Sequence, residues 1–271
     1  MKATYIDHMG DDLSVVNAAK VSFGKRSQWE GGSHPYFDKP KHLSKRDQGL
    51  IQFLARGCTS GDWDNLKGNL TQLVSFHDDI DWQDIEDLLN HIRRMPSHWS
   101  PFAHTAITLH LKMPIFVARQ IMKHTTGIEY NEVSRRYVDS EPEFYVPDVW
   151  RKKADNVKQG SSEEAVNDTF GFKFAVIGQN TIQDEMRRER ESVLDLYKEM
   201  LDHGVAPEQA RMVLPQSMYT EVIATGNLYA WANLYVQRTD SHAQKETQDL
   251  AKQIGEIIQP LYPVSWDALV A

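Results

Sequence analysis

Residues 119–137, RQIMKHTTGIEYNEVSRRY, hold more side chains capable of chemistry than any other window of the sequence. Among the polar and charged residues of this window are Arg119, Gln120, Lys123, His124, Glu129, Asn131, Glu132, Ser134, Arg135, Arg136 and Tyr137. Arginine and lysine side chains beside a serine hydroxyl are typical of phosphate or carboxylate recognition. Because such density is unusual for a solvated helix face, we predict a small-anion site between Lys123 and Arg136.

Two arginines further along the chain are candidates for the same site. Arg211 and Arg238 each lie on a predicted helix that is otherwise poor in positive charge. For Arg211 alone, a surface salt bridge would be the ordinary explanation. The sequence contains neither GxGxxG in a βαβ setting nor GxxxxGK[ST], so a Rossmann or P-loop nucleotide site is disfavoured.

Cysteine and histidine usage restricts the chemistry further. The single cysteine, Cys58, excludes an intrachain disulfide and a cysteine-only metal site. No activating histidine lies near it in ARGCTSGDWD, so we expect a structural thiol rather than a nucleophile. None of the 11 histidines forms an HExxH motif or a similar ligand pair, and we expect no metal site.

The elements that must position residues 119–137 follow from hydrophobic periodicity. Residues 105–113, TAITLHLKM, alternate between apolar and polar types, which predicts a half-buried strand. Pro114 suits the first turn of a helix over IFVARQIMKH. The polar residues of that helix, spaced by three or four positions, would share one face near its C-terminal end. They are Arg119, Gln120, Lys123 and His124.

The N-terminal part of the chain predicts a strand, then a helix beginning near Asp11 or Asp12. Residues 24–42 are rich in glycine, proline and charge, and predict a surface loop. Ser44 and Asp47 have capping-box spacing at the start of a helix that Gly57 would end. Residues 59–96 predict a helical insertion, which Pro96 closes.

The C-terminal part alternates helices with one further strand. Residues 138–160 predict a loop, followed by a helix that begins near Ser161 or Ser162 and a long helix that ends at Gly204, with a break around Gly171 or Gly178. Pro207 begins another helix, residues 216–226 form a strand, and residues 227–263 form two helices. Without repeats or a domain boundary, this pattern predicts a single α+β domain with antiparallel strands.

Length and charge exclude several classes of protein. The chain has 271 residues and a formal net charge of -8, which argues against binding of a nucleic-acid polymer. No run is apolar and long enough to span a membrane, and the N-terminus lacks the apolar core of a signal peptide. We therefore expect a cytoplasmic protein.

The order of motifs along the whole chain resembles a known family. Lys123-His124-Thr125 is followed by eight residues and Ser134, with Asn131-Glu132 before that serine and Arg136-Tyr137 after it. This pattern resembles the signature of the flavin-dependent thymidylate synthases, which is Arg-His-Arg, seven residues and Ser. Further similar blocks, in order, are GDDLSVVNAAKVSF, SPFAHTAITLHLKMPIFVARQ, ARMVLP, TGNL and R-x4-AQ-x-E.

The resemblance implies methylation of dUMP to dTMP, with methylenetetrahydrofolate as carbon donor, NADPH as reductant and FAD as cofactor. It also implies a homotetramer whose active sites are shared between subunits. The positions that match dUMP-binding residues are Gln120, Lys123, Ser134, Arg136, Arg211 and Arg238. Those that match flavin-binding residues are His98, Ser100, Lys123, His124, Thr125, Glu132, Asn227, Tyr229 and Asn233. His98 also matches the position where folate approaches the flavin.

Arg238 matches the arginine thought to activate the uracil. A uracil ring is a poor nucleophile at C5, so a cation that stabilises negative charge on the ring would lower the barrier. Arginine suits this role because it stays protonated and presents a planar fork of donors. The cysteine-dependent thymidylate synthases need a nucleophilic thiol, and Cys58 lacks the surroundings of one.

The chain also departs from the family pattern. Lys123 and Thr125 stand where the family has arginines, and one extra residue lies between 127 and 130. Lysine offers a phosphate its charge but not a bidentate fork. These departures leave two alternatives open: another C5 modification of dUMP, such as hydroxymethylation, and a non-catalytic nucleotide-binding protein with the same fold.

Overall fold

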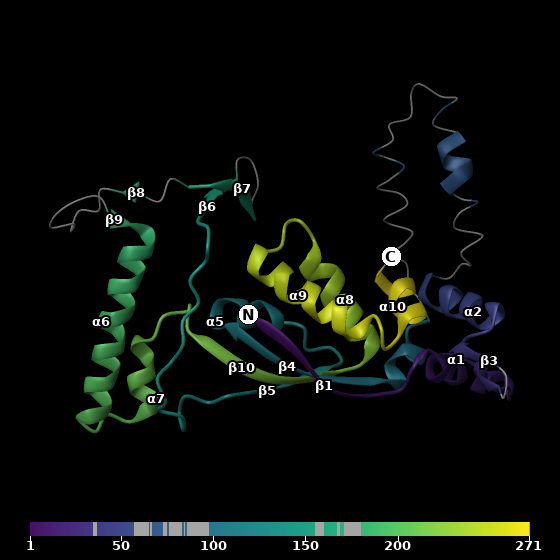
Figure 1. Cartoon of the computed structure of the whole chain (residues 1–271), viewed down its shortest axis with the longest axis horizontal. Helices are drawn as coiled ribbons and strands as arrows, with labels where there is room; N and C mark the ends of the chain where they lie inside the picture. Colours follow the sequence, from purple (N-terminus) through teal and green to yellow (C-terminus); the bar gives the residue numbers. More distant parts are fainter. Residues whose placement is uncertain are drawn as a thin grey trace. The chain divides into compact units, whose positions relative to one another are not determined.

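The computed structural model in Figure 1 describes residues 1–34, 37–56, 65, 67–72, 75, 83, 85, 98–154, 160–166, 169–170 and 180–270. The chain divides into two compact units, each assembled from three stretches of sequence. The first unit contains Met1–Ile6, Leu109–Thr225 and Leu234–Ile254. The second contains Asp7–Thr108, Gly226–Asn233 and Gly255–Ala271. The expectation of a single domain stays a prediction.

A four-stranded antiparallel sheet contains the strands that flank the candidate site. Its strands, in spatial order, are β1 (Lys2–Met9), β4 (Ala106–Pro114), β10 (Tyr219–Gly226) and β5 (Ile128–Glu132). In β4 the side chains of Ile107, Leu109 and Leu111 are fully buried, and the residues between them are partly exposed. Strand β10 alternates in the same way. The strands predicted at the N-terminus, for residues 105–113 and for residues 216–226, and the α+β class, are therefore confirmed.

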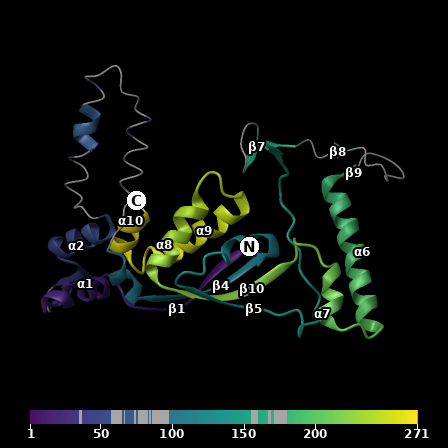
Figure 2. The same ribbon diagram turned by 180° about the vertical axis from the view of Figure 1, so that it is seen from behind.

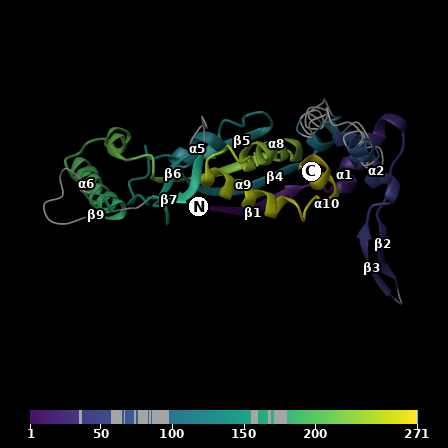
Figure 3. The same ribbon diagram turned by 90° about the horizontal axis from the view of Figure 1, so that it is seen from above.

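Helix α9 (Lys245–Ile258) lies over one face of this sheet in the first unit (Figures 1 and 3). Its fully buried residues Leu250, Ala251 and Ile254 recur at helical spacing. Helix α8 (Leu228–Thr239) precedes it, so the two helices predicted for residues 227–263 are present.

Two further helices, α6 (Ile182–Asp202) and α7 (Pro207–Ala210), lie side by side in the first unit (Figure 2). Pro207 occupies the first turn of α7, as predicted. Helix α6 begins at a capping box in which Thr181 Oγ1 accepts the backbone N–H of Asp184 at 3.1 Å. This reciprocal pair explains why the long helix begins there.

The predicted helix start near Ser161 or Ser162 is wrong, because both residues belong to a strand. Strand β7 (Ser161–Ala165) pairs antiparallel with β6 (Arg151–Lys153), which also interrupts the loop predicted for residues 138–160. A shorter pair, β8 (Thr169–Phe170) and β9 (Asn180–Thr181), follows. Hairpin pairing satisfies backbone groups whatever the side chains are, so this polar sequence did not reveal it.

The loop predicted for residues 24–42 is also wrong, since it contains an antiparallel hairpin. Its strands are β2 (Glu30–His34) and β3 (Phe37–His42), which extend together in Figure 3. The register shifts between Glu30 and Gly32, where Gly31 and Gly32 both have positive φ. Glycine permits this bulge, and the same glycines weakened the strand pattern in the sequence.

The helices of the second unit begin as the sequence predicted. Asp11 caps α1 (Asp12–Lys20) through a capping box with Ser14, and Ser44 Oγ accepts the N–H of Asp47 at the start of α2 (Lys45–Arg56). Two short helical turns, η1 (Val21–Phe23) and η2 (Ser100–His104), complete the unit with α10 (Pro263–Val270). Helix α10 was not predicted from the sequence.

Several expectations concern residues outside the described part of the chain. These are Cys58, the helix end at Gly57, the breaks at Gly171 or Gly178, Pro96, and most of the helical insertion at 59–96. The described positions within that insertion are helical. Among the described residues, no helix is both long enough and apolar enough to cross a membrane.

Candidate functional site

Helix α5 (Ile115–Ile121) ends three residues earlier than the sequence pattern predicted. Lys123 and His124 therefore lie in the segment after the helix, and the prediction that both share its face is wrong. Carbonyl groups at a helix end need donors from elsewhere. The hydroxyl of Tyr130 lies 3.2 Å from the carbonyl oxygen of Ile121 and 2.9 Å from that of His124. Strand β5, which carries Tyr130, thus anchors the segment.

The turn between α5 and β5 can take an additional residue without disturbing the strand. Gly127 is the only member of the 127–130 window outside β5. Its φ of 79° lies in the left-handed region, where glycine avoids the steric cost of a Cβ atom. A longer connection is therefore compatible with a regular β5.

Arg238, near the end of α8, contacts two candidate residues from the 119–137 window. Its Nε donates a hydrogen bond to Nε2 of His124 at 2.8 Å, and its Nη2 donates to the backbone carbonyl oxygen of Gln120 at 3.1 Å. The guanidinium is part-buried and carries five N–H donors, so these two contacts leave donors for a ligand. The fold thus joins three of the predicted site residues.

Burial and the neighbouring charge of Arg238 together favour the neutral form of His124. Burial, and then the positive charge of Arg238, lower the pKa of His124 to about 4. Because Nε2 accepts the hydrogen bond from Arg238, the neutral imidazole carries its proton on Nδ1. His124 can therefore donate from Nδ1 to an acceptor while it remains uncharged.

We expect nuclear magnetic resonance to show His124 titrating near pH 4 rather than near 6.5. The unfolded chain takes up this proton at higher pH than the folded chain does, so His124 should lower the stability of the fold as pH falls from 6.5 towards 4. In Arg238→Gln the pKa of His124 should rise, because the neighbouring positive charge is gone. The spectrum of His124→Gln identifies the resonance, and a wild-type transition near 6.5 would contradict the assignment.

The side chain of Gln120 is held by residues that the sequence analysis did not select. Its Nε2 donates to Oε1 of Gln244 at 2.6 Å, and its Oε1 accepts from the hydroxyl of Thr247 at 3.2 Å. Gln244 in turn donates to Glu246 at 3.0 Å. The signal that could have revealed Gln244 is the AQ-x-E block, in which it is the glutamine. Gln120 therefore presents a fixed amide orientation.

Ser134 and Arg136 lie together after β5. The backbone N–H and Nε of Arg136 both approach the hydroxyl oxygen of Ser134 at 3.4 Å, and the guanidinium lies 5.1 Å from the ring centroid of Tyr137. Arg136 is exposed. This pair offers a cation and a hydroxyl to solvent, a suitable combination for a phosphate.

Glu132 and Arg211, two further candidates of the first unit, each hydrogen-bond to another residue of that unit. Glu132 accepts a hydrogen bond from the hydroxyl of Thr220 on β10 at 2.7 Å. Arg211 begins the short turn η3 (Arg211–Val213), is exposed, and donates from Nε to the carbonyl oxygen of Glu208 at 3.2 Å. Within the described residues, no hydrogen bond or ion pair joins Arg211 to Gln120, His124 or Arg238.

The second unit holds five of the candidates, which are His98, Ser100, Asn227, Tyr229 and Asn233. Three of these five, His98, Ser100 and Asn233, are exposed. The Oδ1 of Asn227 accepts the N–H of Ala230 at 2.9 Å and caps α8. Asn227 therefore has a structural role in addition to any contact with a ligand.

Aromatic rings accompany two of these candidates. His98 stacks on Phe53 with ring centroids 5.5 Å apart, and Tyr229 lies 5.9 Å from Trp99, which is 52% exposed. In the first unit, Lys123 is exposed and has no hydrogen bond or ion pair with any described residue. A free cation suits a pyrophosphate, and exposed aromatic rings suit a fused ring system. Each unit by itself thus offers one kind of group that suits FAD, a cation in the first unit and aromatic rings in the second.

Comparison with known proteins agrees with this chemistry. A family model described as thymidylate synthase complementing protein matches residues 4–264. The flavin-dependent thymidylate synthase of Thermosipho africanus is 32% identical over 265 residues, which cover 98% of this chain and 89% of that protein. The enzyme of the same name from Pseudothermotoga lettingae is 28% identical over 265 residues, covering 98% of this chain and 88% of that protein.

Two solved structures of the UMP/dUMP methylase PolB from Streptomyces cacaoi are also similar. The structure bound with 5-Br UMP has a TM-score of 0.64 and 25% identity, covering 98% of this chain and 92% of that chain. The structure bound with 5-Br dUMP has a TM-score of 0.61 and the same identity, covering 98% of this chain and 93% of that chain. The chain therefore belongs to the family of thymidylate synthase complementing proteins, the enzyme family that the sequence resemblance predicted.

Proposed function

We propose that this protein methylates dUMP at C5 to give dTMP, with methylenetetrahydrofolate as the carbon donor and NADPH as the reductant. The observation that carries the proposal is the contact of Arg238 with His124 and Gln120, residues 114 and 118 positions away in the sequence. The names of the curated relatives support it, as does the dUMP analogue bound to one structural neighbour.

In this proposal the nucleotide is bound by Gln120, Lys123, Ser134, Arg136, Arg211 and Arg238. Arg238 is the catalytic residue. Its guanidinium stabilises negative charge on the uracil oxygens while C5 forms a bond to the methylene carbon, whose bond to the folate nitrogen breaks, and C5 loses its proton. Gln120, whose amide is fixed by Gln244 and Thr247, orients the uracil. Ser134 and Arg136 provide a hydroxyl and a cation for the phosphate.

We assign the binding of FAD to His98, Ser100, Lys123, His124, Thr125, Glu132, Asn227, Tyr229 and Asn233. When bound and reduced by NADPH, the FAD cofactor would supply the hydride that completes the methyl group. Neutral His124 donates a hydrogen bond without adding charge, whereas Lys123 adds the charge that a pyrophosphate requires. No cysteine nucleophile is needed, consistent with the absence of an activating histidine near Cys58 in the sequence.

The proposal includes a homotetramer whose active sites combine residues of different subunits, as the resemblance implies. A cytoplasmic location stays a prediction from the sequence. Light scattering on the flavin-loaded protein tests the assembly, and a monomer that turns over dUMP at full rate would contradict shared sites.

The test of the reaction begins with the absorbance spectrum of the purified protein. We expect a bound flavin that NADPH bleaches, and dTMP as the product when dUMP and methylenetetrahydrofolate are added. Mass spectrometry of the nucleotide separates a methyl product from a hydroxymethyl product. Protein that neither contains nor binds flavin, and forms no modified dUMP, would falsify the proposal.

One observation favours a second substrate. The structural neighbour PolB is named a UMP/dUMP methylase and has been solved with an analogue of each nucleotide. We therefore include UMP beside dUMP in the same assay. Comparable kcat/KM values for the two nucleotides would extend the proposed function to ribonucleotides, whereas turnover of dUMP alone would restrict it.

A further inference from the structure

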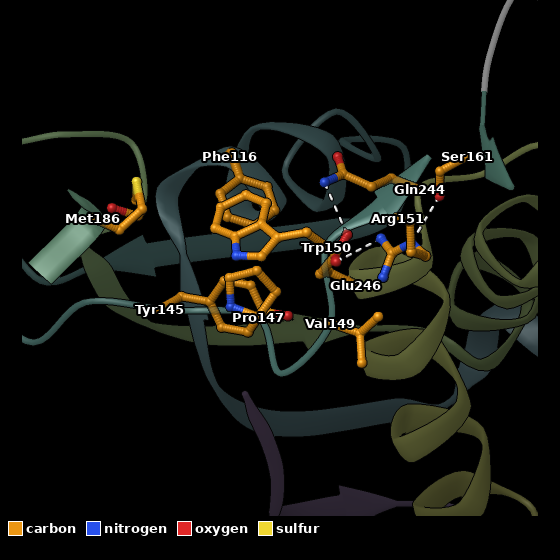
Figure 4. A pocket seen from close by; sticks show the side chains of 11 residues that line it. Phe116, Tyr145, Pro147, Val149, Trp150, Arg151, Ser161, Met186, Gln244 and Glu246 are labelled. Atoms are coloured by element: carbon orange, nitrogen blue, oxygen red, sulfur yellow. Dashed lines mark hydrogen bonds and ion pairs between the residues drawn. The ribbon is translucent and has the colours of Figure 1, made fainter. Parts of the chain in front are cut away.

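A pocket of about 260 Å³ lies within the first unit and contains none of the predicted site residues. Figure 4 shows aromatic side chains, Phe116, Tyr145 and Trp150, on one side and the polar groups of Arg151, Gln244 and Glu246 on the other. Pockets for drug-sized ligands are roughly 300–1,000 Å³. The volume of this pocket therefore suits a smaller ligand of one or two fused rings.

The aromatic side of the pocket is suited to a planar ligand. The rings of Phe116 and Tyr145 have centroids 5.8 Å apart and an interplanar angle of 60°, and the indole of Trp150 is a third wall. Aromatic rings bind other rings by stacking and edge contacts. These walls come from α5 and from the segment before β6, so the fold builds the pocket from separate elements.

The charged groups of the pocket already neutralise each other. Arg151 donates to Glu246 and to the hydroxyl of Ser161, both at 2.7 Å, and Gln244 donates to the other carboxylate oxygen of Glu246. Hydrogen bonds from Arg151 and Gln244 outweigh the effect of burial and lower the pKa of Glu246. Because the ion pair is complete, the pocket favours a neutral ligand over a charged one.

One polar atom in the pocket wall is left without a partner. The Nε1–H group of Trp150 is buried and has no hydrogen-bond partner among the described residues. A buried donor without an acceptor is unfavourable, because it has lost its hydrogen bonds to water without gaining a partner. The group is inaccessible to solvent in this structure, so a ligand with a ring nitrogen or a carbonyl oxygen meets it only when the indole turns towards the pocket, and that hydrogen bond would satisfy the donor.

We propose that this pocket binds a small neutral heteroaromatic molecule of purine size, which stacks on Phe116 and Tyr145 and accepts a hydrogen bond from Nε1 of Trp150. The two-ring size follows from the volume, the planarity from the aromatic walls, and the need for an acceptor from the unpaired indole N–H.

Occupancy of the pocket is coupled to the nucleotide site through Gln244, and this second part rests on the proposed function. Gln244 lines the pocket and accepts the hydrogen bond that orients Gln120. A ligand that draws the amide of Gln244 towards itself releases Gln120 and weakens the binding of dUMP. By linkage, dUMP weakens the binding of that ligand by the same factor.

The test compares two probes of equal ring size on the flavin-loaded protein. Adenine has ring-nitrogen acceptors, whereas indole has one N–H donor and no ring-nitrogen acceptor. Ligand-observed magnetic resonance measures the dissociation constant of each. Trp150→Phe keeps an aromatic wall and removes the N–H donor. It should therefore raise the dissociation constant of adenine about fivefold and change that of indole by less than about twofold. Lys152→Ala, an exposed neighbour outside the pocket, should change neither constant.

A second variant covers the case in which Trp150→Phe does not fold. Val149→Phe enlarges a pocket-lining residue that is 48% exposed, and it should weaken both probes by narrowing the pocket. The absence of adenine binding, or equal losses for adenine and indole in Trp150→Phe, would overturn the site. The dissociation constant of dUMP, measured with and without saturating adenine in the wild type and in Val149→Phe, tests the coupling. An unchanged wild-type constant overturns the coupling and leaves the adenine-binding result intact.

Discussion

Arg238→Ala should lower the turnover of dUMP by about 10²–10³-fold, the usual effect of removing one donor that stabilises negative charge in a transition state. The loss should fall mainly on kcat, because the proposed interaction strengthens as charge develops on the uracil. Steady-state kinetics with dUMP, methylenetetrahydrofolate and NADPH measures it. The flavin should remain bound, and its absorbance relative to protein absorbance provides the second measurement.

Two further variants make the result specific. Arg238→Lys retains the charge but loses the planar fork that reaches both His124 and Gln120, so it should recover only part of the activity. Arg188→Ala removes an exposed arginine of α6 that bonds to Glu185, and should leave turnover unchanged. If Arg238→Ala loses flavin together with activity, the assignment of Arg238 to the uracil is wrong. The residue would then be assigned to flavin binding, since Arg238 also holds His124.

Asp12→Ala should destabilise the protein by about 2–5 kcal/mol through the loss of two buried backbone hydrogen bonds. The carboxylate of Asp12 is 2% exposed and accepts the N–H groups of Val264 at 2.9 Å and Ser265 at 2.8 Å. It therefore caps α10 from α1, a distant part of the sequence. Alanine leaves both N–H groups without an acceptor, and denaturant unfolding followed by circular dichroism measures the loss.

The matched control is Asp249→Ala, which removes a surface pair with Lys245 and should cost about 0.5 kcal/mol or less. Asp12→Asn keeps one acceptor oxygen and should give an intermediate loss. Equal free energies of unfolding for Asp12→Ala and Asp249→Ala would show that the cap of α10 does not stabilise the fold.

The same carboxyl predicts a pH dependence of stability. Burial raises the pKa of Asp12 above 3.8 in the folded state, although hydrogen bonds from Ser265 and Val264 oppose the change. The folded chain then holds this proton to higher pH than the unfolded chain. Protonated Asp12 should therefore stabilise the fold at low pH, and this contribution should decline as the pH rises from 3.8 through the raised pKa of the folded state. Asp12→Asn should lack this decline.

Local patterns were sufficient to predict several elements and candidate residues. Strands β4 and β10 followed from alternation, because one face of each is buried and the side-chain period of a strand is two. The starts of α1 and α2 followed from capping residues, which act within a few positions. The family followed from the ordered blocks, and the family match over residues 4–264 confirmed it.

The predictions from the sequence were wrong or incomplete where a segment depends on partners that its own sequence does not specify. Hairpins β2-β3 and β6-β7 carry glycine or charged residues, yet paired backbone groups hold them as strands. The C-terminal limit of α5 depends on the hydroxyl of Tyr130 in β5. Helix α10, absent from the sequence prediction, receives its cap from Asp12. In each case a contact with another segment, whether near or far in the sequence, helps to decide where an element begins or ends.

By itself, the sequence determined the family, the two central strands and the residue types available for binding an anion, because motifs and periodicity are properties of neighbouring positions. Only the tertiary structure decided which of those residues meet. Arg238 reaches His124 and Gln120 across 114 and 118 positions, and the resulting burial and charge lower the pKa of His124 to about 4. The unpaired indole N–H of Trp150 likewise arises only from packing. Desolvation and hydrogen bonding depend on every group nearby in space, and most of those groups are remote in sequence.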